Sequence, residues 1–284
     1  MRDQAAELRR LVAKKGPSSR IIAVTSGKGG VGKTNFAVNL ALALRQMDYR
    51  VVLIDVDLGL ANADIVLGIT PKYNLGHVMQ GEKTLQEVIM EGPLGLKIIS
   101  GGSGITELAN LDGWRLEAFV SSFEQLNQEF DYVILDTGAG VHRAVMSFVL
   151  AATDIIVVTT PEPTAITDAY GLLKIIHQRA GHAKVRLVVN MAKSPAEAET
   201  VAERLNSVLR EFVRWEVEYA GYILTEAQVA RAIAAQQPIL LSFPSSMASR
   251  SIKRIAGVLA GEEGASQPMG FRGFFARVSG FLHI

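Results

Sequence analysis

The stretch Ile21–Thr34 reads IIAVTSGKGGVGKT, an apolar segment that runs directly into a glycine-rich loop. Its last part satisfies the phosphate-binding pattern G-x-x-x-x-G-K-[ST], and an apolar strand before it and a helical pattern after it supply the context that this pattern requires. The glycines let backbone N–H groups point inward, and the N-terminus of the following helix adds a positive dipole end. The residues expected to surround phosphate are Gly27, Lys28, Gly29, Gly30, Val31, Gly32, Lys33 and Thr34.

Individual side chains of this loop have separate expected tasks. Lys33 should reach the β- and γ-phosphates of a nucleotide, and the Thr34 hydroxyl should bind Mg²⁺. The additional Lys28 resembles the signature lysine in the deviant Walker A loop of the MinD/ParA ATPases. That resemblance implies an ATPase in which Lys28 reaches across a homodimer to the partner's nucleotide. The plain alternatives are a connecting glycine turn and a solvated lysine.

Composition is compatible with one large α/β core. The chain has 284 residues, of which 49% are hydrophobic, and a formal net charge of +1, so no overall basic field predicts specific DNA binding. The absence of cysteine excludes a disulfide framework and the cysteine-ligated iron–sulfur cluster or zinc of some relatives in this ATPase class. Neither a signal peptide nor an apolar run of about eighteen residues is recognisable, so we expect a cytoplasmic protein.

Two carboxylates follow the apolar strand at 51–54. Asp55 and Asp57 should face the nucleotide, because the carboxyl ends of parallel strands are where open α/β sheets place ligands. The following segment resembles switch I of MinD-type proteins, which implies that Asp57 positions the attacking water and Asp55 supports the Mg²⁺ shell. Aspartates at strand ends are often turn formers or caps, and that interpretation is preferred for Asp64.

Two further polar residues close predicted strands. Asp136 ends the strand at 132–135 and matches Walker B, where the carboxylate holds a water of the Mg²⁺ shell, and 137–140 follows as a glycine-rich switch II. Asn190 follows the strand at 185–189 and resembles the asparagine that reads adenine in this class. Its amide donor and acceptor suit adenine, and the N-K-x-D pattern of GTP-binding proteins is absent, so we expect ATP. A plain loop residue is the alternative.

Strand and helix patterns alternate along the chain, which predicts one mainly parallel, eight-stranded sheet with helices on both faces. The expected strands are 21–24, 51–54, 96–99, 132–135, 155–158, 185–189, 219–224 and 239–241. A MinD-like ATPase domain is expected at 20–260. Relatives usually place a proline and an aspartate after the seventh strand, whereas this chain has Leu224-Thr225-Glu226, so the nucleotide-side loop should differ there.

The segment 261–284 is expected to form a linker and an amphipathic C-terminal helix. Arg272 and Arg277 flank its apolar face, and the linker separates it from the domain, so it resembles a membrane-surface helix more than a core element. Docking on its own domain is the alternative. The apolar face comprises Phe271, Phe274, Phe275, Val278, Phe281 and Leu282.

The segment 1–19 is expected to form a short amphipathic helix and a linker. Asp3, Gln4 and Ala5 resemble the N-terminal motif by which the FlhG family, also called FleN or YlxH, activates FlhF, a GTPase of the signal-recognition type. The resemblance implies control of flagellar number or placement, reversible attachment to the cytoplasmic face of the membrane, and flagellar C-ring proteins as further partners. A frayed terminus is the plain alternative. The rival functions are a MinD-type division-site regulator, a ParA-type DNA partition ATPase and a metabolic P-loop kinase.

Overall fold

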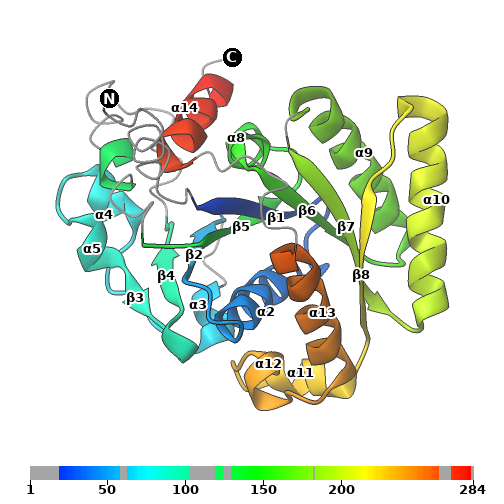
Figure 1. Cartoon of the computed structure of the whole chain (residues 1–284), viewed down its shortest axis with the longest axis horizontal. Coiled ribbons are helices and arrows are strands. Elements are labelled where there is room, and N and C mark those ends of the chain that lie inside the picture. The colour runs from blue at the N-terminus through cyan, green and yellow to red at the C-terminus, as the bar shows by residue number, and fades with distance from the viewer. Residues whose placement is uncertain are drawn as a thin grey trace, which may run out of the picture.

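A computed structural model describes residues 19–57, 63–102, 119–123, 129–181, 183–261 and 270–282. One sheet runs through the molecule with the strand order β3-β4-β2-β5-β1-β6-β7-β8 (Figure 1). Its strands are β1 (Arg20–Ser26), β2 (Val51–Val56), β3 (Met90–Glu91), β4 (Lys97–Ser100), β5 (Tyr132–Ala139), β6 (Asp154–Thr159), β7 (Lys184–Ala192) and β8 (Glu218–Leu224). All pairs are parallel except β3 with β4, which confirms the predicted fold class.

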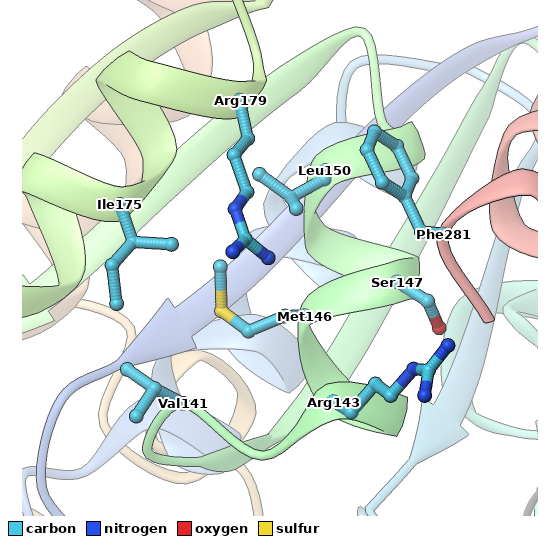
Figure 2. A pocket seen from close by; sticks show the side chains of 8 residues that line it. All are labelled: Val141, Arg143, Met146, Ser147, Leu150, Ile175, Arg179 and Phe281. Carbon is cyan, nitrogen blue, oxygen red and sulfur yellow. The ribbon is translucent and has the colours of Figure 1, made fainter. Parts of the chain in front are cut away.

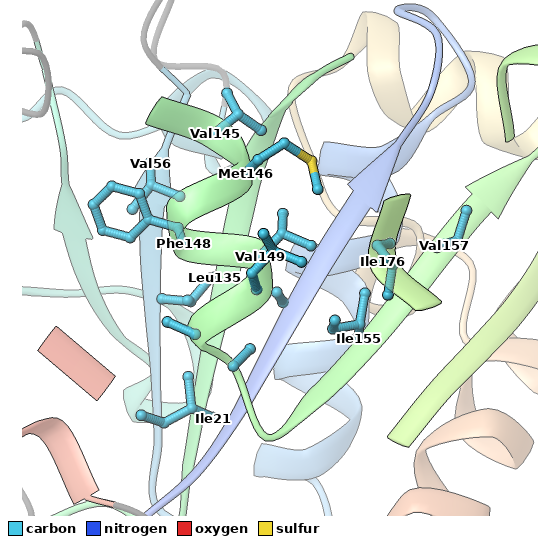
Figure 3. Packing of buried hydrophobic residues seen from close by; sticks show 14 of the residues in the cluster. Ile21, Val56, Leu135, Val145, Met146, Phe148, Val149, Ile155, Val157 and Ile176 are labelled. Carbon is cyan, nitrogen blue, oxygen red and sulfur yellow. The ribbon is translucent and has the colours of Figure 1, made fainter. Parts of the chain in front are cut away.

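Helices cover both faces of the sheet (Figure 1). One buried cluster joins the sheet to α8, α9, α10 and α14, and the second joins it to α2, α12 and α13. In Figure 3, Val145 and Val149 of α8 lie over the central strands. The helices are α2 (Lys33–Arg45), α3 (Ala63–Leu67), α4 (Leu75–Met79), α5 (Leu85–Val88), α8 (Arg143–Ala151), α9 (Pro163–Arg179), α10 (Pro195–Val213), α11 (Ala227–Ala234), α12 (Ile239–Ser242), α13 (Met247–Gly261) and α14 (Gly270–Leu282), with a 3₁₀ turn at Pro93–Gly95.

Strand β1 lies at the centre, between β5 and β6. Both β2 and β6 are buried along their whole length, as apolar strands of a parallel sheet covered on both faces should be. Because the central strands are parallel, the segments that follow β1, β2, β5, β6 and β7 all leave the sheet at one edge. That edge carries the glycine-rich loop and the strand-end carboxylates.

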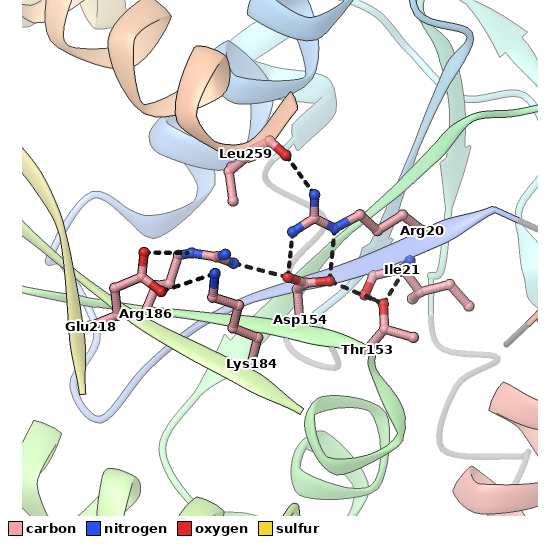
Figure 4. A network of polar contacts seen from close by, with 8 residues as sticks. All are labelled: Arg20, Ile21, Thr153, Asp154, Lys184, Arg186, Glu218 and Leu259. Atoms are coloured by element: carbon pink, nitrogen blue, oxygen red, sulfur yellow. Dashed lines mark hydrogen bonds and ion pairs between the residues drawn. The ribbon is translucent and has the colours of Figure 1, made fainter. Parts of the chain in front are cut away.

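The opposite edge is tied together by a buried ionic network (Figure 4). Asp154 accepts hydrogen bonds from the guanidinium groups of Arg20, at 2.9 and 2.6 Å, and of Arg186, at 2.8 Å. Arg20 also donates to the Leu259 carbonyl near the end of α13. Burial opposes ionisation of Asp154, but the two arginines outweigh it and hold the pKa of this carboxyl below its usual value. The network therefore joins strands β1, β6 and β7 to α13.

The prediction of a strand at 239–241 is wrong, because these residues form the short helix α12. A run of three apolar residues does not distinguish a strand from a helix by periodicity. Here Pro238 precedes the run, and the backbone N–H of Leu240 donates to Asn39 Oδ1 of α2, at 3.0 Å. The eighth strand is instead the two-residue β3, which pairs antiparallel with β4.

The expectation that the C-terminal helix stands apart from the domain is also wrong in this structure. Helix α14 packs on α8, and the Phe274 and Phe148 rings lie 6.1 Å apart between centroids. Phe271 and Phe275 contact Phe123, with centroid distances of 5.2 and 4.9 Å. Phe271, Phe274, Phe275 and Val278 are all at most 4% exposed.

The physical reason is that amphipathicity fixes which face of a helix is buried and leaves open what buries it. An aromatic surface on its own domain can bury the apolar face of the helix as well as a bilayer can.

No helix in the described part of the chain is long and apolar enough to cross a membrane.

Candidate nucleotide site

The glycine-rich loop joins the end of β1 to the start of α2, as predicted. Gly30 and Gly32 have φ angles of 81° and 82°, which L side chains rarely adopt. A Cβ on Gly32 would also overlap the amide of Asn190, and one on Gly27 would overlap the backbone of Asp168 in α9. Close approach of backbone therefore requires glycine at these positions, whereas a Cβ on Gly29 would meet open space.

Lys33 and Asp136 form a buried ion pair inside this loop. Lys33 Nζ lies 2.8 Å from Asp136 Oδ1, and the two side chains are 7% and 0% exposed. Burial raises the pKa of Asp136, and the neighbouring Lys33 and Thr34 lower it only in part. The lysine therefore lies against the carboxylate at the end of the neighbouring strand, and its contact with phosphate stays a prediction.

The residues present fit a Mg²⁺ ion. Asp136 Oδ2 is buried without a hydrogen-bond partner in the described structure, and a hard oxygen acceptor of this kind suits a water of a Mg²⁺ shell. Thr34, the second residue of α2, lies next to Lys33 in the chain and also lowers the pKa of the Asp136 carboxyl. Asp55 is engaged differently: its oxygens accept from the backbone N–H groups of Asp57, at 3.0 Å, and Ala63, at 3.1 Å. Its support of the Mg²⁺ shell stays a prediction.

Asp57 lies where the ends of β2 and β5 meet. Its Oδ1 is 3.2 Å from the position that a Cβ on Gly138 would occupy, so a larger residue there would crowd this carboxylate. The backbone N–H of Gly140 donates to the Ser26 carbonyl at 2.9 Å, which ties the end of β5 to the loop. The structure therefore places Asp57 and the glycines after Asp136 near the start of the phosphate loop, and the role of Asp57 toward water stays a prediction.

Lys28 contacts two residues that the sequence analysis did not assign to the site. Its Nζ lies 2.6 Å from Glu162 Oε1 and 2.7 Å from Thr164 Oγ1, at the start of α9. Lys28 lowers the pKa of the Glu162 carboxyl, and Thr164 adds to the effect. Its position in the sequence could have assigned Glu162 to the site, because it comes soon after β6, at the edge of the sheet that carries the phosphate loop.

Asn190 closes the other side of the loop. Its Nδ2 donates to the Val31 carbonyl at 2.8 Å, and the residue is 8% exposed. This amide therefore contacts the phosphate loop directly, and its reading of adenine stays a prediction. Asp3, Gln4 and Ala5 lie outside the described residues.

A phosphate loop between a central parallel strand and a helix, with a buried lysine–aspartate pair from the neighbouring strand, defines a P-loop nucleoside triphosphatase. The ParA family, described as "NUBPL iron-transfer P-loop NTPase", matches residues 18–260, and this chain belongs to it. The sequence contains no cysteine, the residue that usually ligates iron–sulfur clusters.

Two relatives with known names are similar to this chain along most of its length. The chain is 39% identical to the antiactivator FleN of Pseudomonas aeruginosa, over 90% of this chain and 91% of that protein. It is 36% identical to the flagellum site-determining protein YlxH of Helicobacter pylori, over 99% of this chain and all of that protein.

Solved structures agree with this placement. The MinD cell division protein of Aquifex aeolicus is 25% identical and superposes with a TM-score of 0.70, over 86% of this chain and 98% of the other. The septum site-determining MinD of Pyrococcus horikoshii, solved with Mg-ADP, is 23% identical and shares the fold with a TM-score of 0.68, over 87% and 98%. The protein is a MinD/ParA-type ATPase, with ATP and Mg²⁺ as its cofactors.

Proposed function

We propose that this protein is an ATP-driven switch that controls the number or placement of flagella. The observation that carries the proposal is the extent of the match to FleN and YlxH, which covers 90% and 99% of the chain rather than the P-loop region alone. A shared P-loop supports an activity, whereas a match along the whole chain also includes the surfaces that choose partners.

The first step is ATP-dependent dimerisation. Glu162 and Thr164 of the same chain hold Lys28 in the described structure. The Lys28 side chain is 35% exposed and the Glu162 side chain 56%, so solvent screens this ion pair. Breaking this ion pair therefore costs little free energy, so Lys28 moves readily to the phosphates of a nucleotide bound by the partner subunit. In the resulting homodimer each Lys28 completes the other subunit's site.

The second step is hydrolysis, which returns monomers. Asp57 orients the attacking water, because its carboxylate lies against Gly138 beside the phosphate loop. Lys33 leaves Asp136 for the β- and γ-phosphates. Thr34 and, through water, Asp136 would hold Mg²⁺, with Asp55 in support, and the bound ion would neutralise phosphate charge.

The third step is attachment to the membrane through α14. Its phenylalanine face is buried in the described structure, so the helix must first leave α8. Undocking Phe271, Phe274 and Phe275 forfeits about 5 to 9 kcal/mol, and inserting them into lipid returns a comparable amount. A dimer presents two such helices, and effective concentration then favours reversible binding to the cytoplasmic face of the membrane.

The N-terminal segment 1–19 would bind the partners through which the ATPase acts on flagella. By resemblance, Asp3, Gln4 and Ala5 activate FlhF, with flagellar C-ring proteins as further partners. A peptide of residues 1–15 should raise the GTP turnover of FlhF, and Gln4→Ala should blunt that rise while the matched Lys14→Ala leaves it intact. If the peptide has no effect on the GTP turnover of FlhF, the result would favour the alternative function, that of a MinD-type division-site regulator.

That alternative is a MinD-type division-site regulator. It is favoured by 30% identity to the septum site-determining MinD of Bacillus subtilis, over 93% of this chain and 98% of that protein. A cell lacking the gene separates the two: altered flagellar number with normal septa supports the flagellar function, and misplaced septa support the division function.

A further inference from the structure

A cavity of about 620 Å³ lies between α8, α9 and α14, away from the phosphate loop (Figure 2). Its floor is formed by α8, which contributes Arg143, Met146, Ser147 and Leu150, and Phe281 of α14 forms part of one wall. None of the eight loop residues lines it. The lining residues are Val141, Arg143, Met146, Ser147, Leu150, Ile175, Arg179 and Phe281.

The lining combines a hydrocarbon surface with positive charge. Met146, Leu150, Ile175 and Phe281 offer apolar walls, and Arg179 reaches from α9 toward Met146 (Figure 2). Arg143 adds a second guanidinium, and no carboxylate is present among the residues that line the cavity. Guanidinium groups pair bidentately with carboxylate or phosphate, and apolar clefts of 300 to 1,000 Å³ are typical ligand sites.

We propose that this cavity binds a single-chain anionic amphiphile, of which a fatty acid anion is the simplest. The head group pairs with Arg179, for which the described structure shows no acidic partner. The hydrocarbon chain lies along Met146, Leu150 and Ile175. Charge complementarity selects this ligand over a basic or neutral one, and the basic segment at 1–15 of this chain is excluded on the same ground.

Phe281 links the cavity to the position of α14. Since the docked helix supplies part of the wall, a bound amphiphile stabilises the docked arrangement, and docking in turn strengthens binding by the same factor. This coupling rests on the proposed release of α14 to the membrane. Under it, the amphiphile keeps the protein in its membrane-free state.

Calorimetric titration of the full chain with decanoate, below its critical micelle concentration, tests the site. We expect saturable binding that weakens about fourfold for each methylene removed from the ligand. Arg179→Gln should weaken it by about tenfold, the size of one lost charge-assisted pair. Arg204→Gln, at an exposed arginine of α10 that does not line the cavity, should leave the affinity unchanged. Absence of binding, equal binding of decanol, or full binding by Arg179→Gln would overturn the proposal.

Hydrogen exchange of 270–282 with ADP tests the coupling separately. Decanoate should slow exchange in α14, and Phe281→Ala should weaken decanoate binding. Binding without any change in α14 exchange would overturn the coupling and leave the site standing. Because neither measurement uses liposomes, failure of the proposed membrane function would not be mistaken for failure of the site.

Discussion

Lys28 and Glu162 form an ion pair within one chain, with 2.6 Å between Nζ and Oε1. The pair lies beside the phosphate loop, and Thr164 holds the same ammonium at 2.7 Å. Exposed pairs of this kind contribute at most about 1 kcal/mol. The ion pair therefore fixes the position of the Lys28 side chain within one chain. It is also weak enough to break when the lysine moves to the partner's nucleotide.

Removing the carboxylate that holds Lys28 should favour the dimer. Glu162→Gln is expected to lower the protein concentration needed for ATP-dependent dimerisation by up to about fivefold, the equivalent of 1 kcal/mol. Sedimentation velocity in an Asp57→Ala background measures the shift. Glu82→Gln, an exposed glutamate far from the loop, serves as the control. Weaker dimerisation of Glu162→Gln would show that this carboxylate belongs to the dimer contact instead.

The carboxylate that faces Gly138 should be required for turnover and dispensable for binding. Asp57→Ala is expected to bind ATP and accumulate as an ATP dimer, because the phosphate-binding groups remain. Lys33→Ala should lose nucleotide binding, and Lys28→Ala should bind ATP yet stay monomeric. Asp64→Ala, whose carboxylate only accepts from the Ile65 N–H in the described contacts, is the matched control and should hydrolyse ATP normally. Normal turnover by Asp57→Ala or Lys28→Ala would contradict this mechanism.

The loop glycines should differ sharply in their tolerance of a methyl group. Gly32→Ala combines a positive φ with overlap on Asn190, so it should lower stability by about 1 to 3 kcal/mol. Gly29→Ala places its Cβ in open space and should leave the apo protein's melting temperature within error. Thermal unfolding without nucleotide compares the two. Equal melting temperatures for both variants would mean that the loop rearranges freely around Gly32.

The buried network around Asp154 predicts a pH dependence of stability. Asp154→Asn leaves two guanidiniums poorly neutralised and should cost about 3 to 5 kcal/mol at pH 7. Because the folded pKa lies below the usual 3.8, the carboxylate's contribution is present above pH 3.8 and disappears as pH falls through the folded pKa. The difference between wild type and variant should therefore narrow below pH 3.8. Glu91→Gln, which removes a 65%-exposed carboxylate paired with Lys97, should cost under about 1 kcal/mol.

The parts of the molecule that the sequence predicted best are those where local pattern and chemistry coincide. The loop around Lys33, the carboxylates Asp57 and Asp136 and the central strands all follow from apolar runs that end in polar residues. Glu162 was missed because its contact with Lys28 joins residues 134 positions apart, and no local pattern encodes that pairing. The environment of Phe271 and Phe275 was missed for the same reason, since Phe123 lies far away along the chain.

Weakening the receiving surface should release α14 without altering the helix itself. Phe123→Ala removes ring contacts with Phe271 and Phe275 and should favour undocking by about 3 kcal/mol or more. Liposome flotation should then recover the variant with ADP as well as with ATP. Leu205→Ala, a buried truncation in α10, controls for general destabilisation and should keep the nucleotide dependence. Flotation of Phe123→Ala only with ATP would indicate that docking does not restrain the helix.

In the proposed function α14 must leave α8 before it attaches to a membrane, and hydrogen exchange of residues 270–282 tests most directly whether formation of the ATP dimer drives that release. The Asp57→Ala protein holds ATP without turnover, so exchange can be compared with ADP and with ATP in the absence of lipid. We predict that α14 amides are protected with ADP and exchange at least tenfold faster with ATP, a loss of about 1.4 kcal/mol of local stability or more. Equal protection in the two states, with sedimentation showing an ATP dimer, would contradict the account.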